Sequence, residues 1–385
     1  SPSEWSDNSV SNMHISSKLS LDNNVIYFET IGGRFPKFSE LGRVFNRLLN
    51  FFGLKKEKKI KKGLNPNNVK IFSPLVIPIF NNKVFDYFNK WILLIQVKII
   101  LKKYNFKNII IWCFSPRWNP IIDNLKYKCL IFHCVDALNT YDKSSKFKVL
   151  FDRILKKSDL VITPGTLLYK QLKNIKSETI RIPHGCDDRY LNKFLKKIEV
   201  EKLKNIKKPR AIYVGTLANW IDYDLLTHSV QNNKNVSFII IGYIHALAPR
   251  DKVEELLNFK NVFHLGYKKF EELPKYINAS DVCLVPYDQD NLHIQYSTPT
   301  KFLDYLATGL PIVSTNFVDA KNYKKYIYIS QNKIQFSKLI EQALSEKSIL
   351  LRDKRKKYAL NNTWSKQIKK MEINVSKINF QLFNE

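Results

Sequence analysis

Lys301 and Asp304 place a cation and a carboxylate one turn apart at the start of a predicted helix. Thr298 and Pro299 are typical of a helix N-terminus. Gly309 is typical of a helix C-terminus, where the backbone takes the left-handed conformation. The start of a helix gathers N–H groups without helical partners, so the added charge of Lys301 suits a phosphate. The Asp304 carboxylate could accept hydrogen bonds from sugar hydroxyls. The pair therefore predicts a nucleoside diphosphate site, and the alternative is a solvated ion pair.

A succession of short motifs leads up to this helix. Residues 261–266, 272–276 and 279–287 precede a Pro-x-Lys-x-x-Asp-Tyr-Leu-Ala-x-Gly-x-Pro run that ends at Pro311. This order resembles the donor half of the GT-B-fold, group 1 glycosyltransferases. It is most similar to the bacterial transferases of teichuronic acid and xanthan-type polysaccharide synthesis. The resemblance runs through most of the chain and is strongest over residues 210–315.

The resemblance implies an α/β chain of the GT-B class, with two Rossmann-like domains that face a central cleft. It implies an acceptor-binding domain over 1–205, a nucleotide-sugar-binding domain over 206–350, and helices over 351–385 that pack back on the first domain. A chain of 385 residues of which 44% are hydrophobic can form two cores. The family's first strand is missing ahead of residues 5–21, so we expect it upstream of Ser1.

A donor site in the second domain is also implied by the resemblance. Its expected residues are Gly215, Thr216, Tyr243, Tyr287, Ser297, Thr298, Lys301 and Asp304. Tyr243 and Tyr287 each follow a predicted strand and could stack on a nucleobase, or they could be packing residues. The Arg and Lys that the family carries after Gly215 are absent, and Tyr296 stands where a Glu is expected, so the stereochemistry stays open. The implied donor is a UDP-sugar, used without a metal or other cofactor.

The first domain carries the expected catalytic base. Asp136 ends a predicted buried strand, where ligands of open α/β sheets bind, and its segment resembles the one that holds the base in xanthan-type enzymes. In an inverting reaction this carboxylate could take the proton of the attacking hydroxyl, and the alternative is that it caps a turn. Arg34 and His184 are the other expected cleft residues. His184 lies in a run, 183–187, that resembles the family's Pro-His/Asn-Gly-x-Asp signature.

The chain is strongly basic. It has 63 Lys and Arg against 34 Asp and Glu, a net charge of +29, which favours an anionic partner. Residues 41–62 combine an apolar helical face, beginning at Leu41, with a run of lysines that reaches Lys62. This pattern is typical of a helix lying on an anionic membrane, and the alternative is a core-facing helix followed by a charged loop. No nucleic-acid motif is present, so we expect no nucleic-acid partner.

Other features concern the compartment and the cysteines. No apolar run is long enough to span a bilayer and no signal peptide is visible, so we expect a bacterial cytoplasmic protein at the inner face of the membrane. The cysteines form no CxxC pair and most lie in apolar, strand-like runs, which predicts buried thiols rather than disulfides or a metal site. They are Cys113, Cys129, Cys134, Cys186 and Cys283.

The main functional interpretation is transfer of a sugar to a lipid-linked or polysaccharide glycan in cell-envelope, capsule or exopolysaccharide synthesis. Two other functions remain open. A nucleotide-sugar 2-epimerase-like GT-B enzyme would not need a basic membrane helix. A non-catalytic, membrane-docked glycan-binding subunit could have lost Lys301 and Asp304, which this chain keeps.

Overall fold

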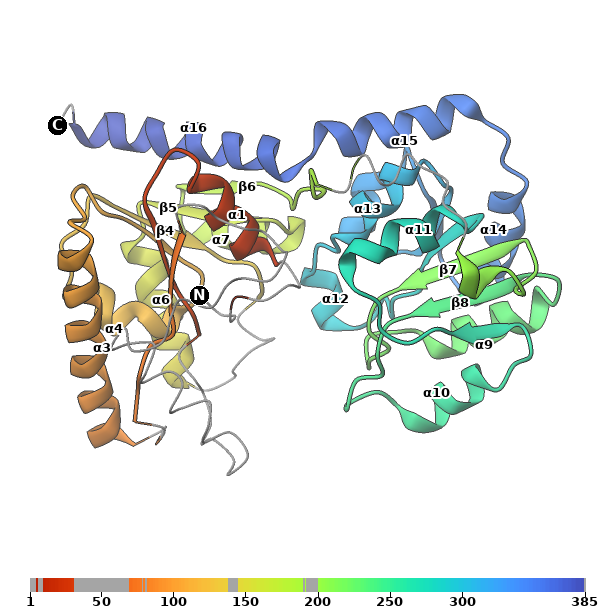
Figure 1. The fold of residues 1–385 in the computed structure, drawn as a ribbon, viewed down its shortest axis with the longest axis horizontal. Helices are drawn as coiled ribbons and strands as arrows, with labels where there is room; N and C mark the ends of the chain where they lie inside the picture. The colour runs from red at the N-terminus through yellow and green to blue at the C-terminus, as the bar shows by residue number, and fades with distance from the viewer. Residues whose placement is uncertain are drawn as a thin grey trace. The chain divides into compact units, whose positions relative to one another are not determined.

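The computed structural model describes residues 5, 10–30, 69–77, 79, 82–137, 145–189, 191 and 200–383. The chain divides into two compact units, each with strands paired in parallel (Figure 1). The first comprises Ser1–Thr163, Leu172–Ile180 and Ile368–Glu385, and the second comprises Pro164–Gln171 and Arg181–Gln367. The domain bounds predicted at 205 and 350 stay predictions.

The first unit is built on a four-stranded sheet with the order β3-β4-β5-β6. Its strands are β3 (Ile110–Cys113), β4 (Cys129–His133), β5 (Leu160–Thr163) and β6 (Thr179–Arg181). β4 is buried along its whole length, as expected for a central strand covered on both faces. A separate parallel pair consists of β1 (Val25–Phe28) and β2 (Val69–Phe72).

Of the helices that the structure describes in this first part of the chain, one precedes the strands and the others follow them. They are α1 (Ser11–Leu19), α3 (Lys83–Lys103), η2 (Pro116–Trp118), α4 (Asn119–Ile122), α6 (Ser145–Lys157) and α7 (Thr166–Ile175). The Asn82 side chain accepts hydrogen bonds from the backbone of Val84 and Phe85 and so fixes the start of α3. No helix among the described residues has both the length and the apolar composition to cross a bilayer.

The second unit is a six-stranded sheet with the order β12-β11-β10-β7-β8-β9, and all its neighbouring strands are parallel. The strands are β7 (Arg210–Val214), β8 (Ser237–Ile241), β9 (Val262–His264), β10 (Val282–Val285), β11 (Ile312–Thr315) and β12 (Tyr328–Ser330). This is the doubly wound order, in which the first and fourth strands of the unit, β7 and β10, lie side by side. In such sheets ligands bind beyond the carboxyl ends of the strands at this switch point.

Two helical layers enclose that sheet. Figure 1 shows α9 and α10 on one side of it and α11, α13 and α15 on the other. The helical segments of the second unit are η3 (Glu201–Leu203), α9 (Tyr223–Asn232), α10 (Arg250–Leu257), η4 (Phe270–Glu272), α11 (Leu273–Asn278), α12 (Leu292–Tyr296), α13 (Lys301–Thr308), η5 (Asp319–Tyr323), α14 (Lys333–Leu344) and α15 (Ile349–Asn361). The last helix, α16 (Trp364–Phe383), belongs to the first unit from Ile368 onward. The predicted buried face of α13 is confirmed, since Phe302, Leu303 and Leu306 are all buried.

The five cysteines are buried and free, as predicted. Burial raises the pKa of the Cys113 thiol to about 11, which keeps it protonated at neutral pH. Cys186 also has a structural role, because its backbone forms hydrogen bonds with Asn362, which follows α15, and with Trp364, the first residue of α16. A Cβ atom on the neighbouring Gly185 would lie 2.3 Å from the Trp364 nitrogen, so only glycine fits this close approach.

Candidate functional site

Lys301 is the first residue of α13, and its side chain reaches the switch point of the second sheet. Its Nζ atom lies 4.3 Å from the centre of the Tyr213 ring and 4.8 Å from the centre of the Tyr287 ring. Tyr213 lies on β7 and Tyr287 follows β10, the two adjacent central strands. Two aromatic faces therefore hold the ammonium group where a doubly wound sheet binds its ligand.

Gly215 brings bare backbone next to this ammonium group. A Cβ atom at Gly215 would lie 2.6 Å from Lys301 Nζ and 2.7 Å from the Tyr213 hydroxyl oxygen. The residue has a φ of +154°, which also favours glycine. Gly242, at the end of β8, is needed for a different reason, because a Cβ atom there would lie 2.0 Å from the Gly215 carbonyl oxygen. The two glycines therefore let the ends of β7 and β8 lie close together, with Gly215 next to Lys301.

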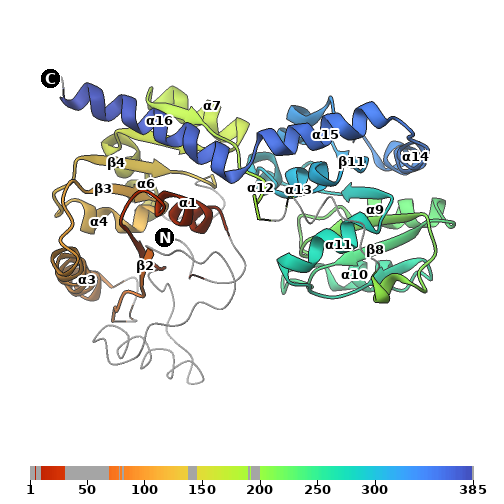
Figure 2. The same ribbon diagram turned by 45° about the horizontal axis from the view of Figure 1, so that its top comes forward.

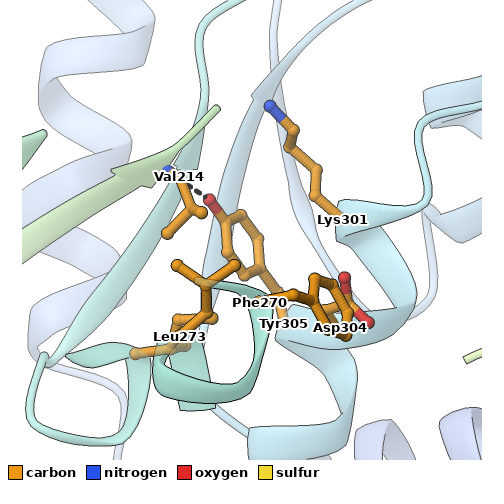
Figure 3. A pocket seen from close by; sticks show the side chains of 7 residues that line it. Val214, Phe270, Leu273, Lys301, Asp304 and Tyr305 are labelled. Atoms are coloured by element: carbon orange, nitrogen blue, oxygen red, sulfur yellow. Dashed lines mark hydrogen bonds between the residues drawn. The ribbon is translucent and has the colours of Figure 1, made fainter. Parts of the chain in front are cut away.

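The charges of Lys301 and Asp304 are both disfavoured by burial. Burial lowers the pKa of Lys301 to about 7, and the Asp304 carboxylate opposes this shift. Burial, and then the negative charge of Asp187, raise the pKa of Asp304 to about 7. The two side chains point in different directions in Figure 3, and no ion pair within 4.0 Å joins these two described residues. Lys301 and Asp304 therefore do not form the solvated ion pair that was the alternative interpretation.

A small pocket lies beneath Lys301. Its lining comprises Val214, Phe270, Leu273, Ile277, Lys301, Asp304 and Tyr305 (Figure 3). The backbone N–H of Val214 donates a hydrogen bond of 2.8 Å to the Tyr305 hydroxyl, which fastens β7 to α13. The pocket volume is about 20 Å³, the size of a single water molecule.

Comparison with known proteins concerns mainly the part of the chain that contains Lys301. Residues 208–346 match the family described as glycosyl transferases group 1. This segment is a group 1 glycosyltransferase domain. The resemblance predicted for residues 210–315 is thereby confirmed, and Gly215, Lys301 and Asp304 all lie within the group 1 domain.

One relative is named TuaH, a teichuronic acid biosynthesis glycosyltransferase of Bacillus subtilis (strain 168). It is 27% identical to this chain over 117 residues, which are 30% of this chain and 29% of the relative. The alignment thus spans less than a third of that relative.

Two solved structures resemble nearly the whole chain. HepE from Anabaena, in complex with UDP and glucose, has 13% identity and a TM-score of 0.63, covering 92% of this chain and 99% of its own. Sucrose-phosphate synthase from Thermosynechococcus elongatus has 14% identity and a TM-score of 0.65, covering 96% and 97%. At these identities the likeness concerns the fold alone, and it confirms the predicted α/β fold of the GT-B class.

The start of α13 in the group 1 domain differs from the prediction. The helix begins at Lys301 after Thr300, and no side chain caps it. Thr298 is not the N-cap, because its hydroxyl donates instead to the buried carboxylate of Asp319. The Ser297 hydroxyl likewise donates a hydrogen bond of 3.1 Å to the backbone oxygen of Ile294. The first N–H groups of α13 are therefore without side-chain caps and can meet an anion.

Tyr243 and Tyr287 have different environments in the group 1 domain. The Tyr287 side chain is buried, packs 5.7 Å from the Phe317 ring centre and turns a face to Lys301, so it has no open face for a nucleobase. Tyr243 follows β8 and is 54% exposed, with its ring centre 6.3 Å from that of Tyr267. Only Tyr243 of the two keeps a ring available for stacking.

Of the expected acceptor residues, the structure describes His184 and Asp136. His184 is buried, with its ring centre 5.7 Å from that of Trp364, so it has the surroundings of a packing residue. Burial lowers the pKa of His184 to about 4, and its side chain is therefore neutral at pH 7. Asp136 follows β4 in the first unit and is half-buried, and its carbonyl accepts a bond of 3.4 Å from the Cys134 thiol. Arg34 and residues 41–62 lie outside the described residues.

Tyr213 belongs to this site and was not predicted from the sequence, although an aromatic residue two positions before a strand-end glycine was an available signal. Trp220 follows β7, and its ring centre lies 6.1 Å from that of His245, which follows β8, and 5.6 Å from that of His293 on α12. Within the described part of the chain no group of three His, Cys, Asp or Glu residues could hold a metal ion, and a metal-independent reaction stays a prediction.

Proposed function

We propose that the protein is a glycosyltransferase that uses a nucleoside-diphosphate sugar, most simply a UDP-sugar. The observation that carries this proposal is the Lys301 ammonium, held between Tyr213 and Tyr287 beside the bare backbone of Gly215. When the bond from the sugar to the diphosphate breaks, negative charge develops on the departing phosphate oxygen. A positioned cation and the uncapped N–H groups of α13 stabilise that charge.

Several independent features support a nucleotide-sugar donor. The group 1 match covers the whole Lys301 site, and the structurally similar HepE was solved with UDP and glucose. The pKa of Lys301 is lowered by burial, so an anion that arrives restores a favourable environment for the ammonium. Asp304, when ionised, can accept hydrogen bonds from sugar hydroxyls.

The acceptor that we propose is a lipid-linked or polysaccharide glycan of the cell envelope. The relative TuaH carries a name from teichuronic acid synthesis, and the net charge of +29 suits work at an anionic membrane. Asp136 remains the proposed base that takes a proton from the acceptor hydroxyl. Its place after the buried strand β4 supports this role, since ligands of parallel sheets bind beyond strand ends.

Calorimetry with UDP tests the donor site directly. Lys301→Met keeps most of the side-chain stem and removes the charge, and it should weaken UDP binding by roughly 10- to 100-fold, because hydrogen bonds to charged groups contribute about 1.5–3 kcal/mol. Lys252→Met is the matched control, since Lys252 is an exposed residue of α10 that pairs with Asp224. Equal UDP affinity in the parent and Lys301→Met proteins would remove Lys301 from the site. If a panel of nucleotides gives no binding to the parent protein, the proposed function is wrong.

A further inference from the structure

The helix α3 has apolar residues on two opposite sides. Its inner side is buried and consists of Asn89, Leu93, Leu94, Gln96, Val97 and Ile100. The outer side, which we call the outer face of α3, consists of Val84, Tyr87, Phe88, Trp91, Ile95 and Ile99. These six residues follow the spacing of one helical side and are between 41% and 60% exposed. A surface helix normally carries polar residues there, so this face calls for a partner.

Aromatic side chains dominate the outer face of α3. The ring centres of Phe88 and Trp91 each lie 6.2 Å from that of Tyr87. The Lys90 ammonium lies 5.4 Å from the centre of the Trp91 ring. Trp and Tyr beside lysine form a surface that is apolar at its centre and polar at its edge, which suits the boundary between lipid chains and headgroups. Figures 1 and 2 show α3 along the outer edge of the first unit.

The charge of α3 identifies the kind of partner. The helix has five lysines, Lys83, Lys90, Lys98, Lys102 and Lys103, against one acidic residue, Asp86. Lys98 and Lys102 are exposed, and their spacing of three and seven residues from Ile95 places them on the outer face. A second copy of this chain would bring the same positive charge to the contact, whereas an anionic lipid surface is complementary to it.

We propose that the outer face of α3 docks on an anionic membrane, with Phe88, Trp91 and Ile95 inserted at the level of the headgroups and the lysines on lipid phosphates. The helix lies in the membrane surface and does not cross it, in agreement with its composition. This inference rests on the proposed function, because a lipid-linked acceptor gives the docking its purpose. It assigns the contact to residues distinct from 41–62.

Co-sedimentation with vesicles tests the proposal on the full chain. The parent protein should bind vesicles of phosphatidylcholine mixed with phosphatidylglycerol more tightly than vesicles of phosphatidylcholine alone, and salt should weaken the binding. A triple variant with Phe88→Ser, Trp91→Ser and Ile95→Ser should bind the mixed vesicles roughly 10- to 100-fold more weakly, because apolar area is lost from the contact. Brominated lipids should quench part of the parent's fluorescence, and that part should be missing in Trp91→Phe.

A matched triple variant controls for the loss of exposed apolar residues in general. Val149→Ser, Ile349→Ser and Leu350→Ser change side chains that are 64%, 75% and 64% exposed on other helices, and should leave vesicle binding unchanged. Both triple variants should bind UDP as the parent does, which shows that they fold. UDP binding and vesicle binding are thus measured separately. If the parent protein does not bind UDP, that result contradicts the proposed function but not the docking of the outer face of α3.

Two results would overturn the docking proposal. One is equal vesicle binding by the parent and the α3 triple variant while both bind UDP. The other is a dimer in sedimentation experiments that the α3 substitutions dissolve, which would assign the outer face to a second copy of the chain. An α3 variant that no longer binds UDP is replaced by the single variant Ile95→Ser, which should still weaken vesicle binding severalfold.

Discussion

The Lys301 ammonium lies 4.3 Å from the centre of the Tyr213 ring, although the two residues are 88 positions apart in the sequence. An aromatic face stabilises a cation by about 0.5–2 kcal/mol, more where water is excluded. Burial disfavours the charged form of Lys301, and the Tyr213 ring favours it. The ring thus supports the ammonium group although Lys301 forms no ion pair with Asp304. A bound anion would stabilise the Lys301 ammonium further.

This relationship predicts coupling between the two side chains. Tyr213→Leu removes the ring and should weaken UDP binding severalfold in the parent protein, because the ammonium loses its support. In the Lys301→Met background the same change should have little further effect. A double-mutant cycle measured by calorimetry gives the coupling directly. Tyr213→Phe is the control, since it keeps the ring and loses only the 3.0 Å bond to the Thr216 carbonyl. Additive losses would show that the two residues act separately.

Binding of UDP should depend on pH through Lys301. Burial lowers the pKa of Lys301 to about 7 in the free protein, and a bound diphosphate favours the ammonium and raises that pKa. Binding therefore takes up a proton above about pH 7, and affinity should fall by up to tenfold per pH unit as the pH rises further. Titrations at several pH values measure this slope. Lys301→Arg stays charged throughout and should give a smaller slope, because only Asp304, whose pKa is also raised to about 7, then titrates in this range. An equal slope in both proteins would show that Lys301 is not the group that takes up the proton.

The two glycines beside Lys301 should respond differently to alanine. In Gly215→Ala the new Cβ atom meets the flexible end of Lys301, so we expect lost UDP affinity with moderate loss of stability. In Gly242→Ala it meets the Gly215 carbonyl, which cannot move freely, so we expect the larger fall in melting temperature. Gly266→Ala is the control for backbone strain alone, because its φ is +64° and nothing lies within 4 Å of the added atom. Equal thermal shifts in the three variants would contradict this ranking.

Asp136→Asn tests the proposed base. The amide keeps the size of the side chain but cannot accept a proton, and loss of a general base typically lowers the rate by about 10² to 10⁴. Sugar transfer should fall by that factor, whereas UDP affinity should not change, because the proposed role of Asp136 is to accept the proton of the acceptor hydroxyl and not to bind the diphosphate. Transfer at the parent rate would exclude Asp136 as the base and favour a mechanism that needs none.

Local sequence signals determined much of the second unit. The periodicity of Phe302, Leu303 and Leu306 and the left-handed Gly309 predicted α13 correctly, because a helix buries one side and ends where the backbone can turn. The apolar surroundings of the cysteines predicted five buried thiols for a similar reason. The order of motifs over 261–315 also predicted the family of this domain, since each motif is short and contiguous.

Tertiary structure decided what those residues contact. Tyr213 and Tyr287 meet Lys301 only because β7 and β10 are neighbours at the switch point of the sheet, and strand order is not a local property. Thr298 is not a cap because Asp319 approaches it from a later turn of the chain. The outer face of α3 was likewise hidden from sequence analysis. A helix that is apolar on two sides has no single face by periodicity, and only the packing of the first unit shows which side stays exposed.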